Sequence, residues 1–184
     1  VLGRILVTGL GIISAIGDSV KQNHEALKHG ICGISTLQYC DTRYSGLRPC
    51  GEIKQTTTVL KEKLQAAEPG VTRTSLLALH AFKEACHNAM LSEAGIASAD
   101  TALIGGCTVG GMCLTDELYH DANKKEDGSP YLSSYDCASV NIYLQQRYAM
   151  KGIINTINTA CSSSANAIMY GARLLQTGFA RRAI

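Results

Sequence analysis

The sequence predicts an α/β fold in which helices cover both faces of a largely parallel sheet, a layered α-β-α arrangement. Short apolar runs at residues 101–106 and 153–157 are typical of buried strands. Segments with apolar residues at helical spacing alternate with these runs, which favours parallel strands joined by helical crossovers. The chain has 184 residues, of which 46% are hydrophobic and 17% are charged, so it is long enough for one sizeable core.

The first third of the chain predicts one strand, one helix and a long irregular segment. We expect a strand at residues 4–8, followed by a glycine-rich turn. A helix then begins at Asp18 or Ser19, either of which can cap it, and ends before Gly30. Residues 31–58 lack periodicity and hold several glycines, so they predict a loop with short strands.

Two helices are expected in the next part of the chain. A short helix that ends before Pro69 is predicted by Leu60, Leu64 and Ala67. Residues 72–94 predict a long helix, which Gly95 would end. The apolar stripe of this long helix comprises Leu76, Leu79, Phe82, Cys86 and Met90.

The elements that follow alternate between strand and helix. After the strand at residues 101–106, residues 115–124 predict a helix and residues 127–130 predict a turn. A further helix ends at Gly152 and is marked by Val140, Leu144 and Tyr148.

The strand at residues 153–157 leads into the last predicted helix, which Gly178 ends. Residues 181–184 have the pattern of the start of another strand, so we expect the chain to be a fragment of a longer protein. This last helix is indicated by four apolar residues that recur at helical spacing, namely Ala165, Ile168, Ala172 and Leu175.

Cys161 lies where this last strand turns into the helix, among the small and polar residues 158–164. Unpaired N–H groups and the positive end of the helix dipole meet at such a turn, so a thiol there should ionise more readily than a free one. It can then form a thioester with an acyl group, while backbone N–H groups stabilise the oxyanion. Ser162 or Ser163 can cap the helix. A buried structural thiol is the alternative that the residues alone leave open.

Composition excludes several classes of function. The net charge of +2 carries no sign of polyanion binding, so no nucleic acid is expected as a partner. No apolar stretch approaches membrane-spanning length and no signal peptide is recognisable, which predicts a cytoplasmic protein without a membrane partner. The eight cysteines form no Cys-x-x-Cys pair, which favours reduced, mostly structural thiols over a zinc site.

The five histidines all fall in predicted helices among polar residues. We expect them at the protein surface, without a metal ion, because no further ligands accompany them. They are His24, His29, His80, His87 and His120.

Four stretches of the sequence together resemble one known family. The segment at residues 159–164, Thr-Ala-Cys-Ser-Ser-Ser, resembles the active-site motif of the beta-ketoacyl synthases, the condensing enzymes of fatty-acid and polyketide synthesis. Residues 7–14, 30–35 and 104–111 resemble the opening strand and turn, the segment after the first helix and the glycine-rich strand end of that family. Their order and spacing agree over nearly the whole chain.

The resemblance implies a thiolase-like fold built from two similar halves, of which residues 1–184 are the N-terminal one. It also implies that Cys161 accepts an acyl group, which then condenses with malonyl-carrier protein through loss of carbon dioxide to give a beta-ketoacyl thioester. The two histidines and the lysine that assist in the family would lie beyond residue 184. Val109 matches a position that lines the acyl pocket, although ordinary packing explains a valine there equally well. No cofactor and no metal are implied.

The partners that the resemblance implies are an acyl carrier protein, acyl and malonyl thioesters, and a second subunit in a homodimer. Residues 155–159 would form the strand that pairs across the dimer. Cys107 and Thr108 depart from the small residues commoner at their positions, and Asn158 stands where polyketide relatives often have Asp. These departures leave the pathway and the acyl chain length open.

Two alternatives remain from the sequence. A non-catalytic subunit of a condensing-enzyme heterodimer would have the same fold, although such subunits have lost the cysteine that is present here as Cys161. A nucleotide-binding module would use Gly9 and Gly11 after a strand, but Ser14 occupies the place of the third glycine of that fingerprint.

Overall fold

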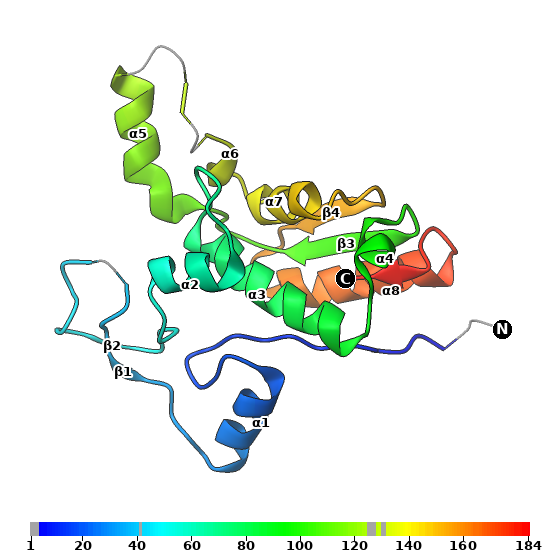
Figure 1. Ribbon diagram of the computed structural model, residues 1–184, viewed down its shortest axis with the longest axis horizontal. Coiled ribbons are helices and arrows are strands. Elements are labelled where there is room, and N and C mark those ends of the chain that lie inside the picture. Colours follow the sequence, from blue (N-terminus) through cyan, green and yellow to red (C-terminus); the bar gives the residue numbers. More distant parts are fainter. Residues whose placement is uncertain (1–3, 41, 125–127, 130–131) are drawn as a thin grey trace. The chain divides into compact units, whose positions relative to one another are not determined.

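The computed structural model describes residues 4–40, 42–124, 128–129 and 132–184 (Figure 1). The chain divides into two compact units, which we describe separately. Unit 1 comprises Val1–Val7, Glu68–Ser75 and Leu91–Ile184, and unit 2 comprises Thr8–Ala67 and Leu76–Met90.

The sheet of unit 1 confirms the predicted parallel arrangement. Strand β3 (Thr101–Gly106) lies between β4 (Ile154–Ile157) and β5 (Arg182–Ala183), and both neighbours run parallel to it. The predicted strand boundaries at residues 101–106 are therefore correct. The core beside the sheet contains Ala102, Leu174 and Ala180, with Ile104, Ile153, Tyr170 and Leu175 packed against them.

Helices lie on both sides of β3 in unit 1. Figure 1 shows β3 between α7 (Ser139–Arg147) and α8 (Ser163–Gln176), and both helices contact the strand. This is the layered α-β-α arrangement that the sequence predicts. The other helical elements of this unit are α4 (Glu93–Ala97), η1 (Met112–Leu114), α5 (Thr115–Lys124), α6 (Leu132–Tyr135) and η2 (Ala160–Ser162).

Helix α7 is fixed to the sheet by one buried amide. The Asn141 Nδ2 donates to the Asn155 carbonyl oxygen at 2.7 Å and lies 2.9 Å from the Thr156 Oγ1. A Cβ atom on Gly105 would lie only 2.5 Å from the Asn141 side chain, so a glycine is needed there. The helix ends at Arg147 rather than at Gly152, and Ala149 beyond it is left-handed, with φ of 48°.

Helix α8 confirms the last predicted helix, but not all of its regularly spaced apolar residues lie on its buried side. Ile168 is 75% exposed, whereas the buried side of the helix carries Ala167, Gly171 and Leu174. The start of the helix lies close to β3, since a Cβ atom on Gly106 would lie 2.7 Å from the Ser164 backbone nitrogen. The apolar pattern alone does not contain this contact.

The edge strand β4 is only partly buried, unlike the fully buried strand that its isoleucines predict. Asn155 is exposed, and the other residues of Ile154–Ile157 are half-buried. The strand pairs with β3 on one side, and no described strand pairs with its other side. Of the turn predicted at residues 127–130, positions 127 and 130 lie outside the described residues.

In unit 2, the first helix agrees with its capping signals. Helix α1 (Val20–Lys28) begins at Ser19, whose Oγ accepts from the Gln22 backbone nitrogen at 3.3 Å. Gly30 follows it with a φ of 65°, as expected for a glycine that ends a helix. Helix α2 (Thr57–Leu64) and the short antiparallel strands β1 (Ser35–Thr36) and β2 (Pro49–Cys50) also confirm the predictions for their segments.

The strand predicted at residues 4–8 is wrong, because no strand is formed there. The chain that follows it in unit 2 bonds instead to side chains of α3 (Arg73–Asn88). The Leu10 backbone nitrogen donates to Asn88 Oδ1 at 3.1 Å, and the Ile12 backbone nitrogen donates to Glu84 Oε2 at 2.9 Å. These helix side chains take the place of a neighbouring strand as hydrogen-bond partners.

The long helix predicted over residues 72–94 is two helices. Helix α3 ends at Asn88, and Met90 is left-handed with a φ of 52° and 92% exposed, so it does not belong to the buried stripe. Ser92 then caps α4 by accepting from the Gly95 backbone nitrogen at 3.2 Å. Gly95 therefore lies inside α4 and does not end the long helix. Leu76, Leu79, Phe82 and Cys86 are buried as predicted.

Candidate active site

Cys161 lies at the strand-to-helix turn where the sequence places it. Strand β4 ends at Ile157, the short η2 helix contains Cys161, and α8 begins at Ser163. The Cys161 residue is exposed. A buried structural role for this thiol, which the sequence alone left open, is therefore wrong.

Ala160, immediately before the cysteine, has an unusual backbone conformation. Its φ is 51°, in the left-handed region, which costs a residue with a Cβ atom about 1–2 kcal/mol. Its carbonyl oxygen accepts from the Ser163 Oγ at 2.7 Å, and the Ser163 Oγ in turn accepts from the Thr159 backbone nitrogen at 2.9 Å. Ser163 thus ties both sides of the strained residue together, which compensates part of the cost.

The serines at the turn do not cap α8 as the sequence predicts. Ser162 occupies the cap position, but its side chain makes no capping hydrogen bond. Its Oγ donates instead to the Thr159 carbonyl oxygen at 2.8 Å, and Asn166 Nδ2 donates to Thr159 Oγ1 at 2.8 Å. The hydroxyl groups therefore stabilise the turn, and the positive end of the helix dipole remains beside Cys161.

The glycine-rich loop after β3 lies against the same turn. The Thr108 Oγ1 donates to the Ala160 carbonyl oxygen at 3.3 Å. Val109 follows in this loop and is 57% exposed. Gly110 is left-handed with a φ of 59°, and a Cβ atom on Gly111 would lie 1.8 Å from the Ser134 carbonyl oxygen. Thr108 precedes Val109, and Ala160 precedes Cys161. The hydrogen bond between Thr108 and Ala160 therefore brings the two predicted site residues close to each other.

Two further residues at this turn were missed by the sequence analysis. The Cys137 Sγ donates to the Thr108 carbonyl oxygen at 2.9 Å, and Asn158 Nδ2 donates to the Cys137 Sγ at 3.3 Å. The sequence favours a structural thiol at Cys137, since nothing in its local pattern connects it with a turn that lies more than twenty residues further on. At Asn158 the sequence shows only a departure from the pattern of polyketide relatives.

Of the described cysteines outside the turn, Cys86 is buried as expected for a structural thiol, whereas Cys32 and Cys50 are exposed. Cys32, Cys50, Cys86, Cys107 and Cys137 have free thiols, as does Cys161. Burial in α3 raises the pKa of Cys86 to about 11. Histidines 24, 29, 87 and 120 are exposed. Within the described residues, no group of three His, Cys, Asp or Glu side chains is arranged to hold a metal ion.

His80 corrects the prediction of surface histidines. It is half-buried, and its Nε2 lies 2.6 Å from the Asp18 carbonyl oxygen. Both residues belong to unit 2, where this contact joins α3 to the start of α1. The role of the ring is therefore structural.

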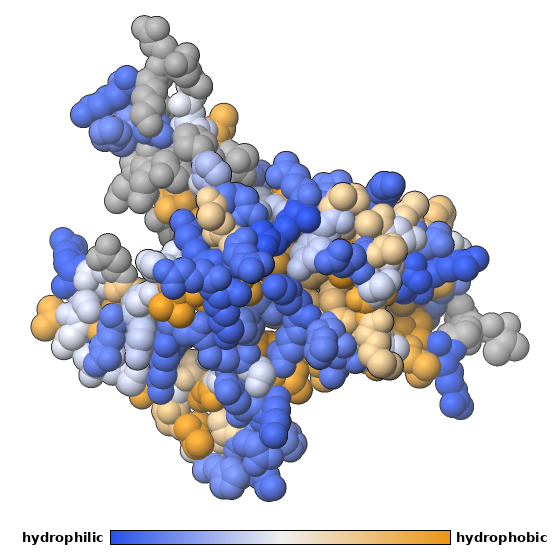
Figure 2. Space-filling view, viewed as in Figure 1, coloured by the Kyte–Doolittle hydropathy of each residue, from blue (hydrophilic) through white to orange (hydrophobic). Residues whose placement is uncertain are grey.

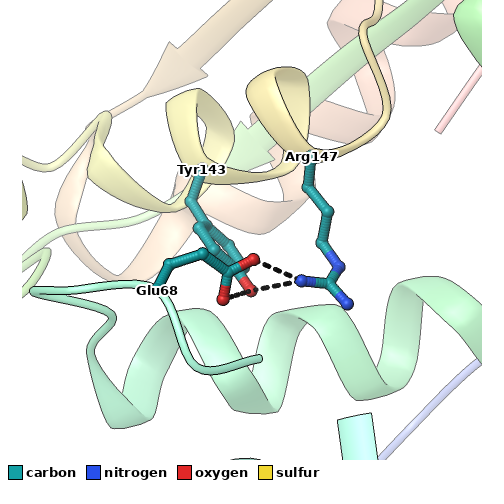
Figure 3. Close-up of polar contacts among 3 residues, drawn as sticks. All are labelled: Glu68, Tyr143 and Arg147. Atoms are coloured by element: carbon teal, nitrogen blue, oxygen red, sulfur yellow. Dashed lines mark hydrogen bonds and ion pairs between the residues drawn. The ribbon is translucent and has the colours of Figure 1, made fainter. Parts of the chain in front are cut away.

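A separate cavity of about 330 Å³ lies in unit 1 beside α7. Glu68, Tyr143 and Arg147 line this cavity. Figure 3 shows that their side chains point toward one another, and Arg147 Nη1 donates to Glu68 Oε1. The Tyr143 hydroxyl donates to Glu68 Oε2 at 3.4 Å. Burial raises the pKa of Tyr143, with Glu68 acting in the same direction and the charge of Arg147 acting against it. None of the residues at the Cys161 turn lines this cavity.

An exposed cysteine at a strand-to-helix turn of an α/β unit is an arrangement in which a thiol can serve as a nucleophile. The family described as "Beta-ketoacyl synthase, N-terminal domain" matches residues 3–184, and the chain therefore belongs to the beta-ketoacyl synthase family. The predicted family is thus confirmed.

Among curated relatives, the chain is 28% identical to "3-oxoacyl-[acyl-carrier-protein] synthase 1" of Buchnera aphidicola, covering 95% of this chain and 44% of that protein. It is 32% identical over 128 residues to "Probable polyketide synthase 24" of Dictyostelium discoideum, covering 70% of this chain and 5% of that protein. The chain thus spans less than half the length of these relatives.

The fold is shared with solved structures of ketosynthases. The ishigamide ketosynthase/chain length factor superposes with a TM-score of 0.80 at 21% identity, covering 98% of this chain and 46% of that one. A beta-ketoacyl synthase from Burkholderia phymatum gives a TM-score of 0.73 at 17% identity. The predicted thiolase-like fold is therefore confirmed. No helix in the described part of the chain has the length and hydropathy needed to cross a bilayer.

Proposed function

We propose that the complete protein is a beta-ketoacyl-acyl-carrier-protein synthase in which Cys161 is the nucleophile. The observation that carries the proposal is the exposed thiol of Cys161 at the start of α8, directly after the left-handed Ala160. A thiol in this place is accessible to a thioester and lies beside the positive end of a helix. The family membership supports the same reaction.

The reaction has two covalent steps at this sulfur. The Cys161 thiolate attacks the carbonyl carbon of an acyl thioester, and the carrier thiol leaves with the electron pair of its bond to that carbon. A malonyl-carrier thioester then loses carbon dioxide, and the carbanion that remains attacks the acyl-enzyme. This forms the new carbon–carbon bond, expels the Cys161 thiolate and gives a beta-ketoacyl thioester. We assign the Cys161 backbone N–H as one donor to the oxyanion of each attack.

We propose further that residues 1–184 are the N-terminal half of the catalytic unit. The coverage of only 44% and 46% of the relatives' lengths supports this. Exposed apolar side chains on α8, Ile168 and Met169, offer a surface for a second half to cover. Hydrophobic residues reach the surface among hydrophilic ones in Figure 2 as well. The assisting histidines and lysine would lie beyond residue 184, so this segment alone should not turn over.

The partners belong to the same proposal. The neighbours that support it are ketosynthases in complex with a chain length factor or with an acyl carrier protein. Strand β4 has an edge that no described strand covers, which suits pairing with a second subunit in a homodimer. Acyl and malonyl thioesters on a carrier protein are the substrates, and the cytoplasm is the expected compartment.

A non-catalytic subunit of a heterodimer is the second candidate, since chain length factors are partners in the neighbouring structures. The accessible Cys161 favours the catalytic role instead. The nucleotide-binding alternative is disfavoured by the packing of its glycines. A Cβ atom on Gly11 would lie 1.9 Å from the Ala81 carbonyl oxygen, and one on Gly9 would lie 2.3 Å from that of Ala85. These glycines serve the contact with α3 and leave no room for a phosphate.

The test uses the complete protein and an acyl-carrier thioester. Mass spectrometry should find the acyl group on the peptide that contains Cys161. Cys161→Ala should lose this adduct and reduce condensation by about 1,000-fold or more. Cys32→Ala, which removes another exposed thiol, should leave both unchanged. Condensation at the normal rate by Cys161→Ala would overturn the proposal. Turnover by residues 1–184 alone would overturn the assignment of the assisting histidines and lysine to positions beyond residue 184.

A further inference from the structure

Two hydroxyl groups converge on the carbonyl oxygen that precedes Cys161. The Ser163 Oγ donates to the Ala160 carbonyl oxygen at 2.7 Å, and the Thr108 Oγ1 donates to it at 3.3 Å. The two hydroxyl oxygens also lie 3.4 Å from each other. Ser163 belongs to α8 itself, whereas Thr108 comes from the loop after β3, more than fifty residues earlier. Thr108 is therefore the long-range support of this carbonyl.

The Ala160 carbonyl matters because it shares a peptide group with the Cys161 N–H. A trans peptide is planar, so its C=O and N–H point in opposite directions from one rigid plane. A hydrogen bond that fixes the carbonyl therefore also fixes the direction of the N–H. This is the N–H that we assign to the oxyanion of the acyl transfer. Because Ala160 has a φ of 51°, its preferred conformation is a different one, and the peptide needs support from outside.

We propose that Thr108 is a positioning residue that aims the Cys161 N–H at the oxyanion, and that Cys137 and Asn158 hold Thr108 for this purpose. This inference rests on the proposed role of Cys161. Asn158 Nδ2 donates to the Cys137 Sγ at 3.3 Å, and the Cys137 Sγ donates to the Thr108 carbonyl oxygen at 2.9 Å. These hydrogen bonds link Asn158 to Cys137, Cys137 to Thr108, and Thr108 back to Ala160, which lies on the same turn as Asn158.

The loop that carries Thr108 is also held on its other side. The Cys107 Sγ accepts from the Gly110 backbone nitrogen at 3.3 Å. A Cβ atom on Gly110 would lie 2.3 Å from the Asp136 carbonyl oxygen, next to Cys137 in the chain. The loop thus has little freedom to move away from the turn, and the hydroxyl of Thr108 remains within reach of Ala160.

The experiment compares two reactions of the same sulfur in the complete protein. Acyl transfer passes through an oxyanion, whereas alkylation by iodoacetamide displaces iodide at a saturated carbon and forms none. Thr108→Val keeps the shape of the side chain and removes the hydroxyl. We expect it to lower kcat for acyl transfer about three- to tenfold with KM unchanged, since one neutral hydrogen bond is lost. The rate of alkylation of Cys161 should stay within about twofold of the original.

Thr108→Ser, which restores a hydroxyl, should recover most of the lost acyl transfer. Cys137→Ala should lower kcat in the same direction by a smaller factor, because it acts only through Thr108. Thr177→Val is the matched control: its hydroxyl also donates to a carbonyl, that of Arg173 at 2.8 Å, but at the far end of α8. This control should change neither reaction.

Three results would overturn the inference: acyl transfer unchanged in Thr108→Val, equal losses in both reactions, or no recovery in Thr108→Ser. Equal losses would mean that Thr108 merely preserves the fold of the turn. These outcomes differ from a failure of the proposed function. If the proposed function were wrong, Cys161→Ala would keep full activity, whatever the result for the Thr108 variants.

Discussion

The turn before α8 in unit 1 and the inward face of α3 in unit 2 each present one cysteine, in opposite surroundings. Cys161 is exposed and is followed at once by the start of a helix. Cys86 is the last buried residue of an apolar stripe, and burial raises its pKa to about 11. In our proposal the same side chain is a nucleophile in one place, whereas in the other it is a small apolar packing group. The difference comes from the neighbouring backbone and from access to solvent.

The largest expected effect is a difference in reactivity between these two thiols. When the native protein is treated with iodoacetamide near pH 7.5, Cys161 should be alkylated about 100-fold or more faster than Cys86, because only the accessible thiolate reacts. Peptide mapping by mass spectrometry measures both rates in one sample. In denaturant the two rates should become similar, which provides the control. Comparable labelling of Cys86 in the native protein would contradict the comparison.

The second prediction concerns Gly106 of β3, which packs closely against the start of α8 beside Cys161. A Cβ atom there would lie 2.7 Å from the Ser164 backbone nitrogen, so Gly106→Ala must push the start of α8 away from β3. We expect a loss of about 1–3 kcal/mol in the free energy of unfolding, measured by urea denaturation, together with slower acylation of Cys161.

Gly51→Ala is the matched control for this substitution. The nearest atom to an added Cβ there is 3.8 Å away, an ordinary contact, so its stability should change by less than about 0.5 kcal/mol. If Gly106→Ala were as stable as Gly51→Ala, the close approach of β3 and α8 would be wrong.

These two regions also show what the sequence contains and what it lacks. Cys161 was found because a strand pattern, small residues and a helix pattern meet at one point, and all of these are local. Cys86 was placed correctly because its neighbours on a helix follow from spacing alone. By contrast, Met90 fits the same spacing but lies beyond the end of α3, where its φ of 52° breaks the helix.

The failures have a common physical cause, which is that they depend on distant partners. Residues 4–8 have the composition of a strand, but the residues after them bond to side chains of α3 rather than to another strand. The contacts of Cys137 with Thr108 and Asn158 join three separate segments. The close approach of Gly106 to the start of α8 joins residues more than fifty positions apart. Periodicity and motifs describe single segments, so none of these contacts was predictable.

Alkaline pH offers a smaller effect, specific to Cys86. Its pKa rises from the ordinary value of 9.0 to about 11 in the folded state, so the unfolded chain loses this proton first. The contribution of the group to stability is therefore complete below about pH 9 and is lost as the pH rises through about 11. Urea midpoints at pH 7, 9 and 11 should fall more steeply above pH 9 in the original protein than in Cys86→Ala. Parallel curves would show that this thiol does not titrate differently on folding.

The smallest expected effect concerns Glu52, a buried side chain that carries a negative charge when it is ionised. Burial raises the pKa of this carboxyl, but hydrogen bonds from the backbone N–H groups of Gln38, Tyr39 and Cys40 outweigh it, so the pKa is lowered overall from 4.5. Its contribution to stability is therefore complete above the unfolded pKa and lost as the pH falls through the lower folded value. Glu52→Gln should lower the urea midpoint at pH 7 and leave it almost unchanged at the acidic end of the titration. An equal fall of the urea midpoint at every pH would mean that only the shape of the Glu52 side chain matters. A fall confined to neutral pH would show that backbone N–H groups stabilise a negative charge in this fold, as we propose for the oxyanion at Cys161.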